Sequence, residues 1–280
     1  MATTATVRQL HDAPAGAGAG ADTLVAIERI TMSFGDFTAV REVDIQVGDG
    51  EFLAIVGPTG CGKSTILNAV AGLLTPAQGR IAIDGKPVKG VQESVGYLFQ
   101  QDALLPWKTA LQNVELGLRF RGVAAAERED RARRWLAKVG LAGFEARYPH
   151  QLSGGQRKRV QMAQALIVEP KVILMDEPFS ALDIHTRHLM QNELLRLWQE
   201  QRRSVMLITH DLEEAIALGD RVVVLSAGPS SRVVESFRVP LDRPRDVAEI
   251  KLDPRFIDLY RDIWACLRGE VEKTYAQQRD

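Results

Sequence analysis

The sequence predicts an α/β fold with a parallel β-sheet at its core, and three observations predict it. An apolar run at 52–56 is followed by a glycine-rich loop and then by a helix-forming stretch at about 63–71. Further strand patterns alternate with helical stretches in the second half of the chain: strands at 172–176, 204–209 and 221–226, helices at about 183–200 and 212–217. The middle, about 101–168, is dense in helix formers and lacks strand patterns. Because strands that alternate with helices build parallel sheets, we expect the helical middle to be inserted into one sheet domain.

The stretch before the glycine-rich loop predicts a second, antiparallel layer. Short β-type runs at 24–30 and 43–47 precede the strand at 52–56, with Gly and Asp residues between them. Two further strands are expected after the first helix, at 80–83 and 95–99.

The chain divides into three parts in this interpretation. Residues 1–22 are rich in Ala, Gly and Thr and lack the apolar stretch of a secretory signal, so we expect a disordered leader rather than a targeting segment. Residues 23–240 form the main domain, with the helical subdomain at about 101–168 inserted in it. Residues 241–280 form a tail, and its final helix, about 254–272, carries apolar residues at helical spacing. We expect that helix to pack on the core.

Composition excludes several classes of protein. With 45% hydrophobic residues among 280, the chain can bury a large core, which excludes a disordered protein. The net charge of −1 offers no general attraction for nucleic acid. Cys61 and Cys266 fit no disulfide framework or metal-ligand spacing, which favours a reducing, cytoplasmic setting. The apolar runs are far shorter than the roughly 20 residues that span a bilayer. The mixed-sign stretch at 127–138 is expected to be a solvated helix face rather than a binding patch.

A phosphate-binding loop follows the strand at 52–56. The P-loop pattern is matched by Gly57, Pro58, Thr59, Gly60, Cys61, Gly62, Lys63 and Ser64, with Thr65 next in the helix. Its backbone N–H groups can surround the phosphates of ATP, Lys63 reaches the outer phosphates, and Ser64 places its hydroxyl on Mg²⁺. The alternative is a purely structural glycine-rich turn. Cys61 is expected to fill space in the loop rather than act as a redox switch.

Two carboxylates end a buried strand. The apolar run at 172–175 is followed by Asp176 and Glu177, where the carboxyl edge of a parallel sheet opens into a nucleotide crevice. We infer that Asp176 joins the Mg²⁺ shell, while Glu177 orients or deprotonates the water that attacks the γ-phosphate. Helix capping alone is the alternative. His210 follows the strand at 204–209 and is expected at the same edge, beside the phosphates.

The order of these motifs resembles the ATPase subunits of ABC transporters. The segment Leu152-Ser153-Gly154-Gly155-Gln156 lies between the P-loop and Asp176 and looks like the signature of that family. Further marks of the family follow in order: Phe34, Gln100 after a strand, Ser180-Ala181-Leu182-Asp183 after the carboxylates, and His210. The resemblance covers about residues 24–239 and implies an ATP-hydrolysing enzyme with the P-loop ABC ATPase fold.

The resemblance implies roles for three residues outside the P-loop. Phe34 would stack on adenine, and His210 would contact the γ-phosphate. Gln100 would link the nucleotide site to the membrane subunit, and it would be both a catalytic and a metal-binding residue.

The resemblance also implies that the protein works as a pair. The signature residues Ser153, Gly154, Gly155 and Gln156 would bind ATP held by the opposite subunit, and the N-terminus of a helix is suited to phosphate. Asp183 would lie at the shared interface. Because the chain carries one P-loop and one signature, two complete sites require two copies.

A closer resemblance is to importers of nitrate, sulfonates and taurine. It depends on the segment from Phe99 to Trp107 and on the tail at 256–271, whereas 156–159 departs from many relatives, which have Met and Gln there. This implies an importer of a small anionic or sulfonate-type solute, located peripherally at the cytoplasmic face of the inner membrane. Its partners would be an integral membrane permease and, indirectly, a solute-binding protein, with no nucleic acid. The run at 104–107 either receives a permease helix or packs in the core.

Three alternatives use the same motifs. A soluble ABC ATPase outside transport usually carries a coiled-coil insertion or a second ATPase copy, and neither is visible here. A non-catalytic module is disfavoured by the intact Lys63, Asp176, Glu177 and His210. An exporter ATPase shares the chemistry, and the tail favours import.

Overall fold

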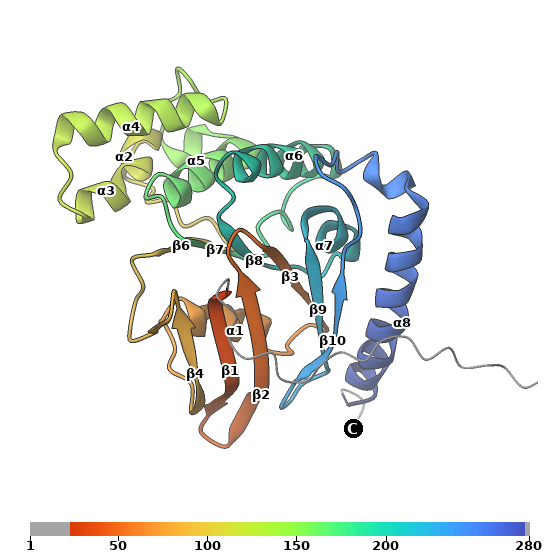
Figure 1. Ribbon diagram of the computed structural model, residues 1–280. Helices are drawn as coiled ribbons and strands as arrows, with labels where there is room; N and C mark the ends of the chain where they lie inside the picture. The colour runs from red at the N-terminus through yellow and green to blue at the C-terminus, as the bar shows by residue number, and fades with distance from the viewer. Residues whose placement is uncertain (1–22, 278–280) are drawn as a thin grey trace, which may run out of the picture.

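Two β-sheets and a group of helices make up the part of the chain that the computed structural model describes, residues 23–277 (Figure 1). The predicted leader at 1–22 lies outside the described residues. The predicted α/β fold with an antiparallel layer and a helical insertion is confirmed.

The larger sheet of the described region has the strand order β10-β9-β3-β8-β7-β6. The strands are β3 (Phe52–Val56), β6 (Val95–Leu98), β7 (Val172–Asp176), β8 (Ser204–Ile208), β9 (Arg221–Leu225) and β10 (Val233–Arg238). Neighbouring strands from β9 to β6 pair in parallel, whereas β10 pairs antiparallel with β9 at the edge. The parallel strands therefore end at one edge, where a nucleotide site is expected.

Both faces of this sheet are covered, which explains its continuous apolar runs. In β3, Phe52, Ala54 and Val56 belong to one core cluster and Leu53 and Ile55 to another, because successive side chains point to opposite faces. The first cluster includes the helical part of the chain, and the second includes the smaller sheet.

The smaller sheet is antiparallel, with the strand order β2-β1-β4-β5. Its strands are β1 (Thr23–Phe34), β2 (Phe37–Gly48), β4 (Gln78–Ile83) and β5 (Lys86–Pro87). The helix α1 (Lys63–Val70) buries Ile66 and Leu67 in the core shared by the two sheets. This layer therefore holds the start of α1, and with it the P-loop, against the central sheet.

The inserted helices form a separate group beyond the β6 and β7 edge (Figure 1). They are α2 (Ala110–Val114), α3 (Leu116–Phe120), α4 (Ala125–Lys138), the 3₁₀ turn η1 (Pro149–Gln151) and α5 (Gly154–Leu166). Charged residues of α4 pair with one another at i,i+4 spacing, as in Arg133 with Glu129 and Arg134 with Asp130. These exposed pairs agree with the prediction of a solvated helix face.

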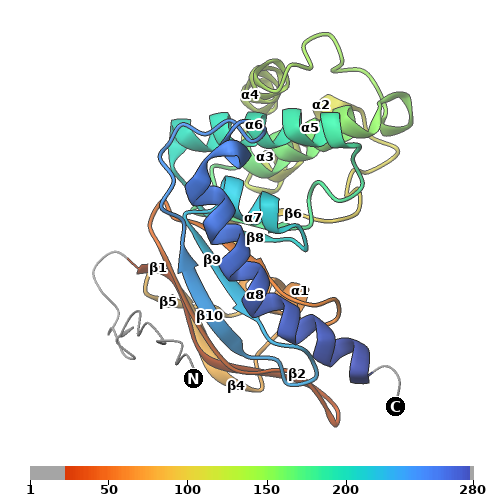
Figure 2. The same cartoon turned by 90° about the vertical axis from the view of Figure 1, so that its right-hand side faces the viewer.

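The remaining helices follow β7 in the chain. They are α6 (Ile184–Gln201), α7 (Leu212–Leu218), the 3₁₀ turn η2 (Ile250–Leu252) and α8 (Pro254–Gln277). Figure 2 shows α8 running across β9 and β10, and it buries Phe256, Leu259, Ile263 and Leu267 in the core. No helix in the range 23–277 is both long and apolar enough to cross a membrane.

Two strands were not predicted from the sequence. The strand β5 has only two residues, and β10 carries exposed Glu235 and Ser236 beside its apolar residues. Because β10 is an edge strand with much of its surface exposed, its sequence lacks the apolar run that identified the other strands.

Candidate functional site

The P-loop joins the end of β3 to the start of α1. Gly60 and Gly62 have φ of 79° and 92°, in the left-handed region that glycine adopts without strain. A Cβ at Gly62 would also come within 2.5 Å of Val40 Cγ1, so the smaller sheet restricts this position. The loop is thus shaped by its glycines and by its packing on β2.

Lys63 lies inside the loop. Its Nζ donates to the carbonyl oxygens of Gly57 and Pro58, both at 2.9 Å, and the residue is only 7% exposed. Neutral carbonyls hold this buried ammonium, and within residues 23–277 it forms no ion pair with a carboxylate, so it is available for an anion that enters the loop. Burial raises the pKa of the neighbouring Cys61 thiol, which opposes formation of the reactive thiolate and fits a space-filling role.

Asp176 lies at the end of β7, opposite the P-loop. Its Oδ1 accepts a hydrogen bond of 3.0 Å from the Ser64 hydroxyl. Burial raises the pKa of the Asp176 carboxyl, the negative charge of Glu177 acts in the same direction, and Ser64 and Lys63 oppose them. The two residues predicted to share Mg²⁺ are therefore adjacent.

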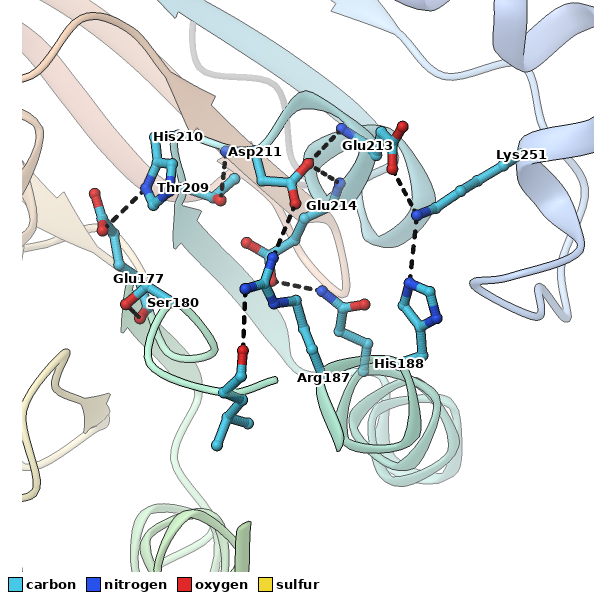
Figure 3. Close-up of polar contacts among 12 residues, drawn as sticks. Glu177, Ser180, Arg187, His188, Thr209, His210, Asp211, Glu213, Glu214 and Lys251 are labelled. Atoms are coloured by element: carbon cyan, nitrogen blue, oxygen red, sulfur yellow. Dashed lines mark hydrogen bonds and ion pairs between the residues drawn. The ribbon is translucent and has the colours of Figure 1, made fainter. Parts of the chain in front are cut away.

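Three of the predicted site residues meet at the carboxylate of Glu177. Its Oε2 lies 3.3 Å from Gln100 Nε2 and 3.1 Å from His210 Nδ1, and Figure 3 shows the contact with His210. The backbone N–H of Glu177 donates to Ile208 O at 2.9 Å, which extends the pairing of β7 with β8. The carboxylate thus lies where three strand ends converge, because Gln100, Glu177 and His210 follow β6, β7 and β8.

Phe34 lies at the end of β1 and is 49% exposed. Its neighbour Phe37, at the start of β2, is 52% exposed. An aromatic ring is thus open to solvent at the position predicted to stack on adenine.

The signature segment forms the start of α5. Ser153 is its N-cap: Ser153 Oγ accepts from Gln156 N at 3.2 Å, and Gln156 Oε1 accepts from Ser153 N at 2.9 Å. Gly154 and Gly155 form the first turn, and a Cβ on Gly155 would lie 3.0 Å from Thr186 Cγ2. The signature therefore packs beside the start of α6, and its N-terminus is exposed.

Asp183 is the N-cap of α6 and accepts a hydrogen bond of 3.0 Å from Thr186 N. That hydrogen-bonded cap lowers the pKa of the Asp183 carboxyl. Within residues 23–277, no hydrogen bond or ion pair joins the signature residues or Asp183 to the P-loop. One chain therefore brings the P-loop, Asp176, Glu177, Gln100 and His210 together and leaves the signature apart.

A polar connection between Asp102 and α5 was not predicted. Arg157 Nε lies 2.6 Å from Asp102 Oδ2, and Gln161 Nε2 donates to Asp102 Oδ1 at 3.1 Å. Lys158 Nζ adds a hydrogen bond of 3.3 Å to Phe99 O. The partners are 55 to 59 residues apart in sequence, so no local pattern could have revealed them.

An apolar groove of about 460 Å³ lies between β6 and the inserted helices. Its lining includes Phe99, Leu116, Phe120 and Val168, and Phe120 is 82% exposed. The sequence instead indicated the run at 104–107 as a segment that either receives a permease helix or packs in the core. Leu104 of that run is buried in the core, and Trp107 is 70% exposed but does not line this groove.

Comparison with sequence families and relatives identifies the family of this chain. The model of the ABC transporter family matches residues 40–180. The taurine import ATP-binding protein TauB of Pseudomonas entomophila is 45% identical over 248 residues, which are 86% of this chain and 95% of that protein. An ABC transporter ATP-binding protein of Methanocaldococcus jannaschii is 44% identical over 236 residues, 84% of this chain and 86% of that protein.

Solved structures show the same fold. An ATP-binding cassette in a dimeric post-hydrolysis state, bound to ADP and Pi, has a TM-score of 0.68 at 33% identity and covers 78% of this chain and 100% of its own. CbiO1 of Clostridium perfringens, part of the ABC transporter complex cbiONQ, has a TM-score of 0.70 at 26% identity, with 91% and 99% covered. The chain therefore belongs to the ABC transporter family and is one of its ATP-binding ATPase subunits.

Proposed function

We propose that this protein hydrolyses ATP as a pair of copies and thereby drives a membrane permease that imports a small anionic or sulfonate-type solute. The observation that carries the proposal is the meeting of Gln100, Glu177 and His210 beside the P-loop. These three residues follow different strands, so their meeting at one carboxylate is a property of the fold and of no single motif.

ATP binding falls to the P-loop and Phe34 in this proposal. The backbone N–H groups at the start of α1 favour phosphate oxygens, as does the partial positive charge of the helix terminus. Lys63 supplies a full positive charge that no carboxylate neutralises in the described structure. The exposed ring of Phe34 stacks on adenine.

The site suits Mg²⁺ as well. The hydroxyl of Ser64 and the carboxylate of Asp176 are hydrogen-bonded, and Gln100 lies nearby on Glu177, so oxygen ligands of the kind that Mg²⁺ prefers are close together. When bound, Mg²⁺ would neutralise charge that develops on the phosphates during transfer.

Hydrolysis depends on Glu177. A carboxylate in this place can accept a hydrogen bond from water and align it for attack on the γ-phosphate. Gln100 and His210 each donate to the same oxygen, Oε2, when His210 carries its proton on Nδ1. These contacts orient the Glu177 carboxylate and leave Oε1 for water.

Pairing of two copies explains why the signature lies apart from the P-loop. The N-terminus of α5 and Asp183 are exposed, and in the proposal they complete the ATP site of the second copy. The dimeric relative in a post-hydrolysis state supports this arrangement.

The permease would dock in the groove between β6 and the inserted helices. Its exposed Phe120 and apolar lining fit an amphipathic helix, which would bury its own apolar face there. Phe99 also lines the groove and is followed by Gln100, which contacts Glu177. Docking of a permease helix would therefore shift Gln100 and, through it, the carboxylate of Glu177.

The proposed location is peripheral, at the cytoplasmic face of the inner membrane. The relatives named for taurine import support a sulfonate or similar anion as the solute. In the proposal, a solute-binding protein delivers this solute to the permease.

The Glu177→Gln variant tests the proposal. It keeps the size of the side chain and removes the base, so we expect the hydrolysis rate to fall at least about 100-fold. ATP affinity should stay near that of the unchanged protein, and ATP with Mg²⁺ should produce dimers measurable by light scattering. Glu235→Gln, on the exposed edge strand β10, is the matched control. Hydrolysis by Glu177→Gln at the rate of that control would contradict the proposal.

A further inference from the structure

Arg187 connects two loops that carry proposed site residues. It lies in the first turn of α6, four residues after the N-cap Asp183. Its Nη2 donates to Leu182 O at 3.1 Å, in the loop that leads to Asp183. Its Nη1 lies 3.5 Å from Asp211 Oδ2, immediately after His210 (Figure 3). One guanidinium therefore contacts both the segment before Asp183 and the segment of His210.

Asp211 is itself firmly held. Its Oδ1 accepts from the backbone N–H groups of Glu213 and Glu214 at 2.9 and 3.2 Å, which makes it the N-cap of α7. Its own N–H donates to Thr209 Oγ1 at 3.0 Å. Because His210 lies between two residues in this bonded unit, a displacement of Asp211 changes the place of the His210 ring.

A small cavity separates Arg187 from the carboxylate of Glu177. It measures about 10 Å³ and is lined by residues that include Glu177, Ser180, Arg187, His210 and Glu214. That volume is near the lower limit for one water molecule. Arg187 Nε is buried and has no hydrogen-bond partner in the described part of the chain. Arg187 therefore has one N–H donor without a partner in the described residues and lines the same cavity as the proposed base.

Glu214 completes the surroundings of the guanidinium. It is 5% exposed, and its Oε1 accepts from Gln191 Nε2 at 2.8 Å. Gln191 lies one turn after Arg187 on α6, so α6 and α7 are joined by two polar contacts on the same side. The start of α6 and the His210 segment are therefore linked through Arg187 and through Gln191.

We propose that Arg187 is a positioning residue for hydrolysis, which transmits the docking of a second copy at Asp183 to the orientation of His210 toward Glu177. The inference depends on the proposed pairing and on the proposed roles of Glu177 and His210. Arg187 makes no contact with the P-loop among residues 23–277, so its effect falls on turnover and not on ATP binding. The planar fork of a guanidinium can bridge the Leu182 carbonyl and the Asp211 carboxylate at once, which a lysine ammonium does less well.

The first test compares Arg187→Gln with Arg187→Lys and Arg196→Gln. Arg196 lies on the same helix but pairs with Glu193 and Glu200 at the surface, so it is the matched control. We expect Arg187→Gln to lower kcat about tenfold while the KM and Kd for ATP stay within about twofold. Arg187→Lys should recover part of kcat, and Arg196→Gln should keep all of it.

The second test asks whether Arg187 acts through Asp211. Asp211→Asn keeps a side-chain oxygen that can cap α7 and loses the charge that faces Arg187. In that background, Arg187→Gln should lower kcat clearly less than it does in the unchanged protein.

Three results would overturn the inference. They are a kcat of Arg187→Gln within about twofold of the Arg196→Gln control, a parallel loss of ATP affinity, and an equal loss of kcat in both backgrounds. If any of them occurs while Glu177→Gln remains slow, the proposed function stands and only the role of Arg187 fails. Normal hydrolysis by Glu177→Gln would instead remove the proposed function.

Discussion

At the scale of single residues, the site holds several side chains in arrangements that stability alone would not favour. Glu177 has φ of 43°, in the left-handed region that non-glycine residues rarely adopt. Lys63 is buried among carbonyl groups, and the carboxyl group of Glu214 is buried beside the His210 segment. Such strain and buried charge concentrate where proteins bind ligands or catalyse reactions.

The buried Glu214 makes stability depend on pH. Burial raises the pKa of its carboxyl above the ordinary 4.5, while hydrogen bonds from Thr209 and Gln191 oppose the shift. The folded chain thus binds this proton more tightly than the unfolded chain does, so the contribution to stability is largest at low pH and declines as pH rises above 4.5. Glu214→Gln removes the titration, so its melting temperature relative to the unchanged protein should rise as the pH increases above 4.5. A difference in melting temperature that is the same at every pH would contradict this.

At the residue scale, the sequence allowed us to predict which of the site residues lie close together but not the contacts that they make. The P-loop, Asp176, Glu177 and His210 follow apolar strands, and the carboxyl ends of parallel strands share an edge, so their proximity could be predicted. The hydrogen bond from Ser64 to Asp176 could not be predicted, and neither could the contacts of Gln100 and His210 with one oxygen of Glu177. Both depend on side-chain rotamers. No sequence pattern marked Arg187 as a candidate site residue, because charged residues near the start of a helix are common on protein surfaces.

At the scale of elements, the tail helix α8 is part of the core of the molecule. Ile263 is fully buried in the same cluster as residues of β9 and α7, and Glu270 accepts a hydrogen bond of 2.9 Å from the backbone N–H of Ala227, just beyond β9. The helical spacing of its apolar residues allowed the prediction of both helix and packing. The neighbouring strand β10 could not be predicted, because its alternation of apolar and polar residues is broken at an exposed edge.

Substitution in α8 should separate packing from catalysis. Ile263→Ala removes a buried side chain and should lower the free energy of unfolding by about 2–4 kcal/mol. Ile257→Ala on the same helix, where the residue is 41% exposed, should cost less than about 1 kcal/mol. Urea unfolding of both variants measures the difference. Equal costs would show that α8 is not packed as described, and the Kd for ATP should be unchanged in both.

At the scale of the whole molecule, the exposed signature and the apolar groove are two surfaces that suit binding to other chains. The signature residues and Asp183 have no bond to the P-loop of the same chain within 23–277, and the groove carries an 82% exposed Phe120. In the proposed function, the first surface binds a second copy and the groove binds the permease. The sequence predicted the need for two copies from the single P-loop and single signature, whereas the groove arises from residues of β6, α3 and α5 that meet only in the fold.

Complementation between two inactive variants tests the central claim most directly. Lys63→Ala disables the P-loop, and Ser153→Arg places a bulky charge at the N-terminus of α5, so each variant alone should hydrolyse ATP very slowly. In a mixed pair, the intact P-loop of one copy faces the intact signature of the other. ATPase activity of the mixture should therefore exceed the sum of the two separate proteins, and it should do so only after subunits exchange. A mixture no more active than that sum would contradict a site shared between two copies.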